Sequence, residues 1–276
     1  MMKKFMKKHF SWNDLLILPI TIVFLYPFYF LIISTFKTLR DVSYNPTAFP
    51  TQLYLGNYIE VFTKTPILTA FRNTILLTVC SVAVIVFIGE MAAYPIVFNT
   101  NKLNNALQIY LMLGFLVPFQ TILLCLFEVM QKLHLLDSLP GMIVFYSNGC
   151  TLPIFLASGF MRSIPKELNE AAIVDGAGPA RVFFRIILPL MKPITITIVI
   201  FQTMWIWNDF IAPNIFLNSR ANTTLVLEIF RAKGQFTVNW PSFMAQSVIT
   251  IFPIFVFYCF MQKHIIKGLT AGAVKG

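Results

Sequence analysis

The chain has 276 residues, of which 57% are hydrophobic and only 12% are charged, and its formal net charge is +10. A soluble domain usually carries about 25% charged residues, so a single water-soluble core cannot hide this much apolar surface. The mean hydropathy of +0.75 therefore predicts a membrane protein. The basic residues lie at the ends of apolar runs and not among aromatic stacking residues, which favours orientation in an anionic membrane over nucleic-acid binding.

Six apolar runs are long enough to cross a bilayer, which needs roughly 20 residues. They are residues 15–36, 73–98, 106–130, 139–160, 194–216 and 243–261. Each run is continuous, and backbone groups in lipid must pair within their own segment, so we expect six spanning helices. Pro118 and Pro153 lie inside two of these runs and fit an ordinary kink or a hinge equally well. No soluble domain is expected, so residues 1–276 are predicted to form a single transmembrane domain.

The distribution of Lys and Arg predicts the orientation of the chain. With six spans both termini lie on one side, which would hold 13 of the 21 basic residues, against 8 on the other side. Because cytoplasmic loops are enriched in Lys and Arg, we expect both termini, the loop 162–193 and the tail 262–276 to be cytoplasmic.

Charged and polar residues inside the apolar runs are candidates for a substrate path. An ionised carboxylate at a helix centre costs roughly 2.5–3.5 kcal/mol on insertion scales. Asp209 and Asn208 lie beside Trp205 and Trp207, and aromatic faces with carboxylate or amide groups suit a sugar. A structural polar cluster that joins helices fits these four residues equally well. Glu90 is the fifth candidate, although a helix-joining or gating role is favoured for it over substrate contact.

The polar loop 162–193 carries the most distinctive pattern. Glu170-Ala171-Ala172 is followed by Asp175-Gly176 and, after nine intervening residues, by Ile-Ile-Leu-Pro at 186–189. Ser163 and Pro165 are typical of a helix start, and Gly176, Gly178 and Pro179 of a helix end and turn, so we expect a helix over 166–177. Ile164, Leu168, Ala171 and Ala172 would lie along one side, which the alanines keep flat enough for another protein to approach. The alternative, a helix lying on lipid headgroups, is disfavoured because this apolar face is small.

The pattern resembles the EAA loop of permease subunits of bacterial ABC importers. The EAA triplet, the glycine four residues after it and the Ile-x-Leu-Pro ending all match. Residues 27–38, 207–210 and 262–276 are similar to the MalG-like, sugar-type branch, and the resemblance covers nearly the whole chain from residue 15. Lys263 stands where the family often has Arg, which keeps the charge. The resemblance implies an all-α, six-helix transmembrane bundle of the type I importer kind, in a bacterial plasma membrane.

The resemblance also implies partners. These are a homologous MalF-like permease subunit, a dimeric cytoplasmic ABC ATPase and an extracellular sugar-binding protein, all in a lipid membrane and with no nucleic acid. The loop and the tail would contact the ATPase through Glu170, Ala171, Ala172, Asp175, Gly176, Ala177, Gly268, Gly272, Lys275 and Gly276. No GxxxxGK[ST] phosphate loop occurs in the chain, so ATP hydrolysis is expected in the separate ATPase. We expect no cofactor, no metal and no catalytic residue here.

The expected function is that of a membrane-spanning subunit of an ATP-driven importer for an oligosaccharide or related carbohydrate, forming half of the path. An ABC importer for a different solute is one alternative, against which the sugar-type tail argues. A standalone ion-coupled carrier is another, for which the scattered carboxylates are thin evidence. An enzyme is disfavoured because the three histidines, His9, His134 and His264, are far apart in sequence.

Overall fold

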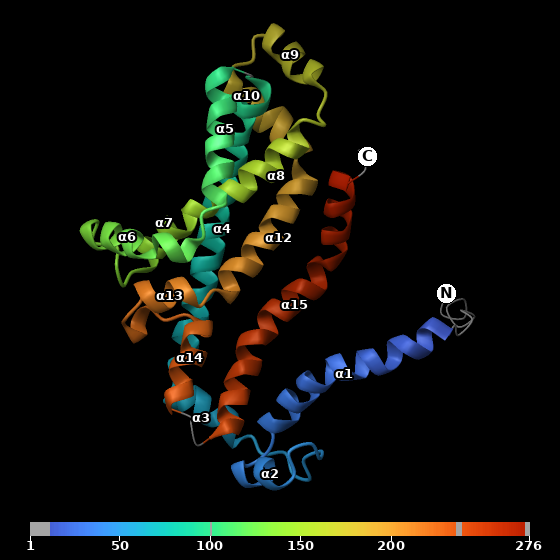
Figure 1. The fold of residues 1–276 in the computed structure, drawn as a ribbon, viewed down its shortest axis with the longest axis vertical. Helices are drawn as coiled ribbons and strands as arrows, with labels where there is room; N and C mark the ends of the chain where they lie inside the picture. Colours follow the sequence, from blue (N-terminus) through green and yellow to red (C-terminus); the bar gives the residue numbers. More distant parts are fainter. Residues whose placement is uncertain (1–11, 100, 236–238, 274–276) are drawn as a thin grey trace. The chain divides into compact units, whose positions relative to one another are not determined.

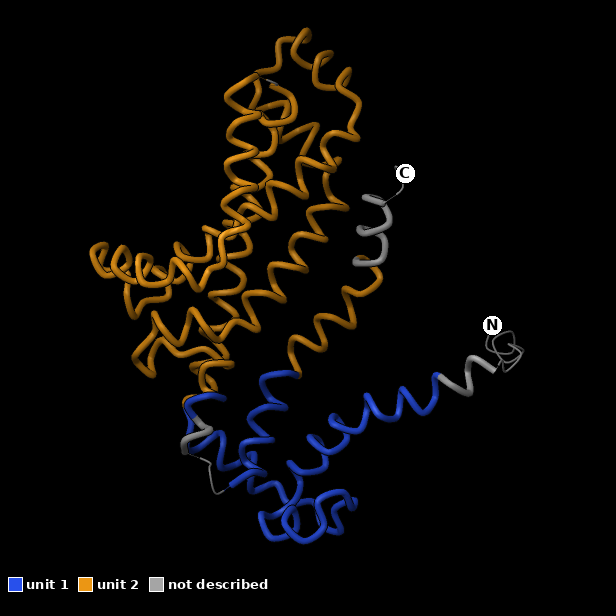
Figure 2. Tube along the Cα trace, viewed as in Figure 1, with its two compact units in different colours: residues 1–65, 229–251 blue, residues 66–228, 252–276 orange. Residues whose placement is uncertain are grey.

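The computed structural model describes residues 12–99, 101–235 and 239–273, and every regular element among them is a helix (Figure 1). The chain divides into two compact units, coloured separately in Figure 2. Unit 1 comprises residues 1–65 and 229–251, and unit 2 comprises residues 66–228 and 252–276.

Unit 1 is organised around the end of its first helix. Its elements are α1 (Trp12–Thr35), α2 (Leu39–Tyr44), α3 (Gly56–Lys64) and the first turns of α15 (Trp240–Ala273). The Asn57 amide donates hydrogen bonds to the carbonyl oxygens of Thr35 and Lys37, both at 2.8 Å. Asn57 is buried, so these bonds hold α3 against the turn where α1 ends.

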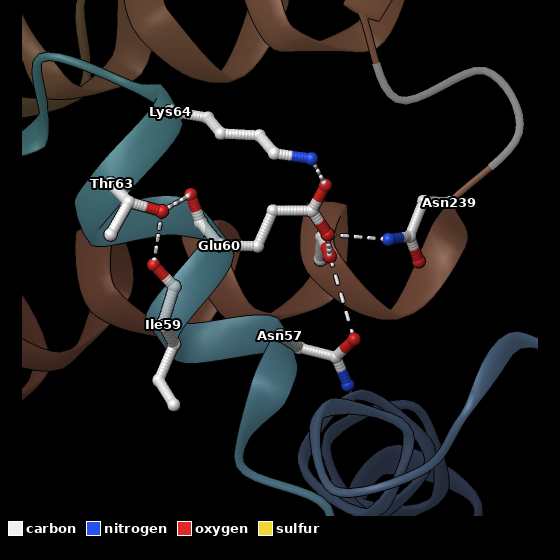
Figure 3. Close-up of polar contacts among 7 residues, drawn as sticks. Asn57, Ile59, Glu60, Thr63, Lys64 and Asn239 are labelled. Carbon is white, nitrogen blue, oxygen red and sulfur yellow. Dashed lines mark hydrogen bonds and ion pairs between the residues drawn. The ribbon is translucent and has the colours of Figure 1, made fainter.

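A second polar cluster in unit 1 centres on Glu60 (Figure 3). Its carboxylate accepts hydrogen bonds from Lys64 at 2.7 Å, from the Asn239 amide at 2.6 Å and from the Ser242 hydroxyl. Burial alone would raise the pKa of Glu60, but these hydrogen bonds and the charge of Lys64 outweigh it and hold the pKa below its ordinary value. An ionised carboxylate therefore connects α3 to the start of α15.

Unit 2 is built on the long helix α4 (Ile67–Phe98), which packs against α7, α8 and α12. The other helices are α5 (Lys102–Phe115), α6 (Phe119–Lys132), α7 (Leu139–Ser147), α8 (Thr151–Met161), α9 (Lys166–Val174), α10 (Pro179–Val182), α11 (Leu188–Leu190), α12 (Lys192–Asn208), α13 (Ile211–Phe216) and the start of α14 (Leu225–Gln235). Gly89 brings α4 close to α8, because a Cβ there would lie 2.6 Å from Pro153 Cβ. Larger residues at Gly89 would push the two helices apart.

The predicted all-α, membrane-spanning fold is confirmed, with four helices that are long enough to span and two further candidates that are bent pairs of helices. Helices long and apolar enough to cross a membrane are Ile17–Thr35, Ile67–Phe98, Leu139–Met161 and Trp240–His264. Two bent pairs raise the total to six if each counts as one span: Lys102–Phe115 with Phe119–Lys132, and Pro179–Leu190 with Lys192–Asn208. These numbers refer to the described part of the chain.

The expected continuous third span, 106–130, is the larger departure. Its two halves, α5 and α6, differ in direction by 102°. Pro118, at the start of α6, has no N–H to donate to the preceding turn and disfavours helical geometry at the residue before it. Pro118 therefore separates two helices, and the change in direction is much larger than that of an ordinary proline kink.

The fifth span also differs from its expected bounds, 194–216. The helix α12 ends at Asn208, because Asp209 is extended, with φ −70° and ψ 129°. The short helix α13 then begins at Ile211. Asp209 therefore lies in a break between two helices and not within a continuous span.

The turn before α7 is held against the end of α13 by Asp137. One carboxylate oxygen of Asp137 accepts the backbone N–H groups of Asn218 and Ser219 and the Ser219 hydroxyl, each at 3.0 Å. Its own N–H donates to the Phe216 carbonyl at 2.7 Å. Burial would raise the pKa of Asp137, but hydrogen bonds from Ser219, Asn218 and Asn222 outweigh it and hold the pKa below its ordinary value.

Asp137→Ala is expected to lower the free energy of unfolding by about 1–2 kcal/mol, since the partners are partly exposed. The depressed pKa means that the carboxylate's contribution is complete above the unfolded-state pKa, about 3.9, and is lost as the pH falls through the lower folded-state value. Thermal unfolding of the detergent-purified chain, from neutral pH to about pH 2, measures both effects. Glu128→Ala, at an exposed carboxylate, is the control, and equal losses in the two variants would contradict the prediction.

Candidate functional site

The predicted loop helix is present as α9, and it is anchored to α4. Asn169 on α9 is 6% exposed, and its Oδ1 accepts a hydrogen bond from the Tyr94 hydroxyl at 2.7 Å. Tyr94 also packs against Phe183, with ring centroids 5.6 Å apart. A displacement of α9 would therefore act directly on α4 and on the segment leading to α12.

The end of α9 is fixed by Gly176. The Ala177 N–H donates to the Ala172 carbonyl at 2.9 Å and the Gly176 N–H to the Ile173 carbonyl at 3.0 Å. This pair of bonds is the Schellman motif, which needs a left-handed residue at its centre. Gly176 has φ +78°, which glycine adopts without steric cost. The glycine of the EAA pattern therefore gives the helix a defined, rigid end.

One side of α9 is exposed and the other is buried. Glu167, Glu170, Ala171 and Val174 are all exposed, and their spacing places them along one helix face. Val174 is 87% exposed and adds an apolar side chain to this face. We call these four residues the α9 outer face.

The expectation that Ala171 and Ala172 share one flat side is wrong. Ala172 is 8% exposed and packs in the core with Val182 and Ile187, as does Ile164. The turn of the helix between 171 and 172 places the two alanines on different sides. Of the remaining loop candidates, Asp175 and Gly176 are exposed and Ala177 is half-buried.

The tail candidates are less fully described. Gly268 and Gly272 lie in the last turns of α15. Lys275 and Gly276 lie outside the described residues.

Asp209, a substrate-path candidate, is held by its own chain. Its Oδ2 accepts a hydrogen bond from the Tyr146 hydroxyl at 2.9 Å. Its Oδ1 accepts the backbone N–H of Ile211, the first residue of α13, at 2.9 Å. Both oxygens are engaged, so the structure favours the helix-joining interpretation of Asp209.

The other substrate-path candidates at the end of α12 differ in how exposed their side chains are. Trp207 is 7% exposed, whereas Trp205 is 47% exposed. The Trp205 ring meets Tyr146 edge-on, with centroids 5.5 Å apart, and lies over Gly149, where a Cβ would be 2.8 Å from it. Asn208 is exposed on the same face, three residues on. The Asn208 amide nitrogen donates to the Met204 carbonyl at 2.7 Å. Trp205 therefore offers an aromatic face, and Asn208 its amide oxygen, to an external molecule, whereas Trp207 is buried.

Glu90 is 2% exposed in the middle of unit 2. The Thr195 hydroxyl of α12 lies 2.6 Å from Glu90 Oε1. Glu90 is closed off from the surface and joins α4 to α12, as the helix-joining interpretation expects.

Four residues of these sites could not be singled out from the sequence. They are Tyr94 and Asn169, which anchor α9, Tyr146, which holds Asp209 and Trp205, and Thr195, which contacts Glu90. Asn169 carries a weak signal, as an amide within the EAA loop. The Tyr146–Asp209 contact joins positions 63 residues apart, and no local pattern encodes it.

Comparisons with known proteins agree with the resemblance to ABC importer permeases found in the sequence. A family model described as "Binding-protein-dependent transport system inner membrane component" matches residues 85–271. The chain is 33% identical to the probable starch degradation products transport system permease protein AmyC of Thermoanaerobacterium thermosulfurigenes, over 93% of each chain. It is 34% identical to the melibiose/raffinose/stachyose import permease protein MelC of Bacillus subtilis, over 91% of each. The fold matches a chain of a bacterial ABC transporter involved in alginate import with TM-score 0.81 and 21% identity, covering 91% of this chain and 94% of that one.

Proposed function

The chain belongs to the family of binding-protein-dependent transport system inner membrane components, and from this premise we propose that it is a sugar-importing permease subunit driven by a separate ATPase. It is a multi-pass protein of the bacterial plasma membrane. The carbohydrate class of the solute is supported by the names of relatives such as AmyC and MelC. The solute would be an oligosaccharide or a related carbohydrate.

Coupling to the ATPase is proposed to act through the α9 outer face. The observation that carries this proposal is an exposed helix face, with Val174 at 87% exposure, on a helix that is rigidly capped at Gly176. A motor subunit that moves such a helix transmits the motion as a rigid body. The Asn169–Tyr94 hydrogen bond gives that motion a direct connection to α4. Gly268, Gly272, Lys275 and Gly276 are proposed to contact the same ATPase.

The remaining partners are proposed from the family description and from the resemblance of the sequence. Its description requires a binding protein, which is proposed here to be extracellular and sugar-specific. A homologous, MalF-like subunit is proposed to supply the other half of the path. Trp205 and Asn208 are the proposed substrate contacts in this half, because they expose an aromatic face and an amide.

Purification of the intact complex from its native membrane tests this function. A second permease and a cytoplasmic ATPase are expected to remain bound, and a malto- or galacto-oligosaccharide with its binding protein is expected to stimulate ATP hydrolysis. A dipeptide and glycine betaine are the matched solutes for the alternative ABC importers. Stimulation by either of them, or uptake into vesicles without ATP, would overturn the proposal.

A further inference from the structure

Two cavities of unit 2 adjoin the contact between α5 and α8 (Figure 1), and we call the line that joins them the seam; the second cavity is also lined by the end of α4 and the start of α9. The first is a groove of about 560 Å³ lined only by residues of these helices and the turn after α5, among them Met112, Leu113, Leu116 and Phe155. All but one of its eight lining residues are apolar, Thr151 being the exception. The volume lies in the range of small-molecule sites, about 300–1,000 Å³.

The second cavity, of about 170 Å³, has a mixed lining, in which five residues are apolar and the other three are Asn105, Arg162 and Lys166. It lies where α4 and α8 end and α5 and α9 begin, and its lining contains no acidic residue. Arg162 donates a hydrogen bond to the neutral Gln108 side chain at 2.9 Å, so its charge is not compensated by that contact. Neither Arg162 nor Lys166 forms an ion pair with a residue of the described chain.

The distance between the two cavities matches the distance between the head and the chain of an amphiphilic molecule. Arg162 and Phe155 are seven residues apart along α8, or about 10 Å at helical rise. Asn105, Ile109, Met112 and Leu116 run along one side of α5 at helical spacing, from the second cavity into the apolar groove. A single molecule with an anionic head and an apolar chain would therefore satisfy both ends of the seam at once.

We propose that this seam binds an anionic phospholipid, with its phosphate group at Arg162 and Lys166 and an acyl chain in the groove between α5 and α8. Basic pockets between helices at the polar boundary of a membrane are suited to lipid headgroups. Free phosphate would leave the apolar groove unused. An apolar helix of another membrane subunit would cover the groove but would leave the charges of Arg162 and Lys166 unpaired. An anionic lipid would pair with both, so the charge favours lipid. The inference does not depend on which solute the chain transports.

Photo-crosslinking of the intact complex in phosphatidylcholine nanodiscs tests the site. The probes are a phosphatidylglycerol and a phosphatidylcholine that carry the same diazirine-labelled acyl chain. The phosphatidylglycerol probe is expected to label peptides of α5 and α8 about tenfold more strongly than the phosphatidylcholine probe. Unlabelled phosphatidylglycerol should compete, whereas inorganic phosphate should not. This comparison uses the wild-type chain, so it does not rely on any variant folding.

Paired variants locate the headgroup. Arg162→Gln with Lys166→Gln is expected to remove the preference for phosphatidylglycerol. Arg185→Gln with Lys192→Gln, two exposed cations that do not line either cavity, is the charge-matched control and should retain it. Equal labelling by both probes, displacement by inorganic phosphate, or capture of another membrane subunit by a crosslinker placed at Leu113 would each overturn the proposal. ATP-driven sugar uptake is scored separately, so failure here is distinct from failure of the transport function.

Discussion

Gly176→Val is expected to lower the rate of ATP-driven uptake by roughly tenfold or more, while the chain still inserts in the membrane. Gly176 has φ +78°, where a β-branched residue is strongly disfavoured. A Cβ at this position would meet nothing within 4 Å, so the effect would come from the backbone and not from a clash. Uptake of radiolabelled oligosaccharide into cells, normalised to the amount of inserted protein, measures the loss.

The matched control is Gly178→Val, two residues further on. Gly178 has φ −70° and ψ 160°, an extended conformation that valine favours, and a Cβ there also meets nothing within 4 Å. The control is expected to transport at nearly the wild-type rate. If both variants transported normally, the rigid end of α9 would have no role in coupling.

Trp205→Ala is expected to raise the KM for oligosaccharide uptake about tenfold, with little change in the amount of folded protein. Trp205 is 47% exposed, and its edge-on contact with Tyr146 orients the ring. Loss of that exposed face removes a stacking surface for a sugar but leaves only a small gap in the core. Trp205→Phe should recover part of the affinity, because it restores an aromatic face.

Trp207→Ala provides the contrast, since Trp207 is 7% exposed. Truncation of a buried Trp typically costs about 3–5 kcal/mol of stability. We therefore expect less folded protein, with an unchanged KM for the part that inserts. A loss of sugar affinity equal to that of Trp205→Ala would assign both residues to the fold and remove Trp205 from the substrate path.

Hydropathy could predict that segments lie in the membrane, but not whether each one is a continuous helix. The runs 106–130 and 194–216 have the composition of a span, yet their chains break at Pro118 and Asp209. A proline inside an apolar run can bend a helix slightly or end it, and the outcome depends on what the neighbouring helices bury. The break at Asp209 depends on Tyr146, which lies 63 residues away.

The candidate site was predictable where its geometry is local. The left-handed glycine after the EAA triplet could be read directly, because Gly176 closes a helix end through bonds to Ala172 and Ile173. The division of Ala171 from Ala172 could not, because it depends on which side of α9 meets Val182 and Ile187. Alanine is small enough to suit either an interface or a core, so its identity alone does not decide between them.

The break between α5 and α6 has a consequence for biogenesis. Each of these helices has 14 residues and is therefore about 21 Å long, whereas the hydrocarbon layer is about 30 Å thick. We therefore expect neither helix to span the bilayer by itself. Because α8, synthesised later, lies against α5, we infer that stable membrane integration of this region depends on the downstream helices.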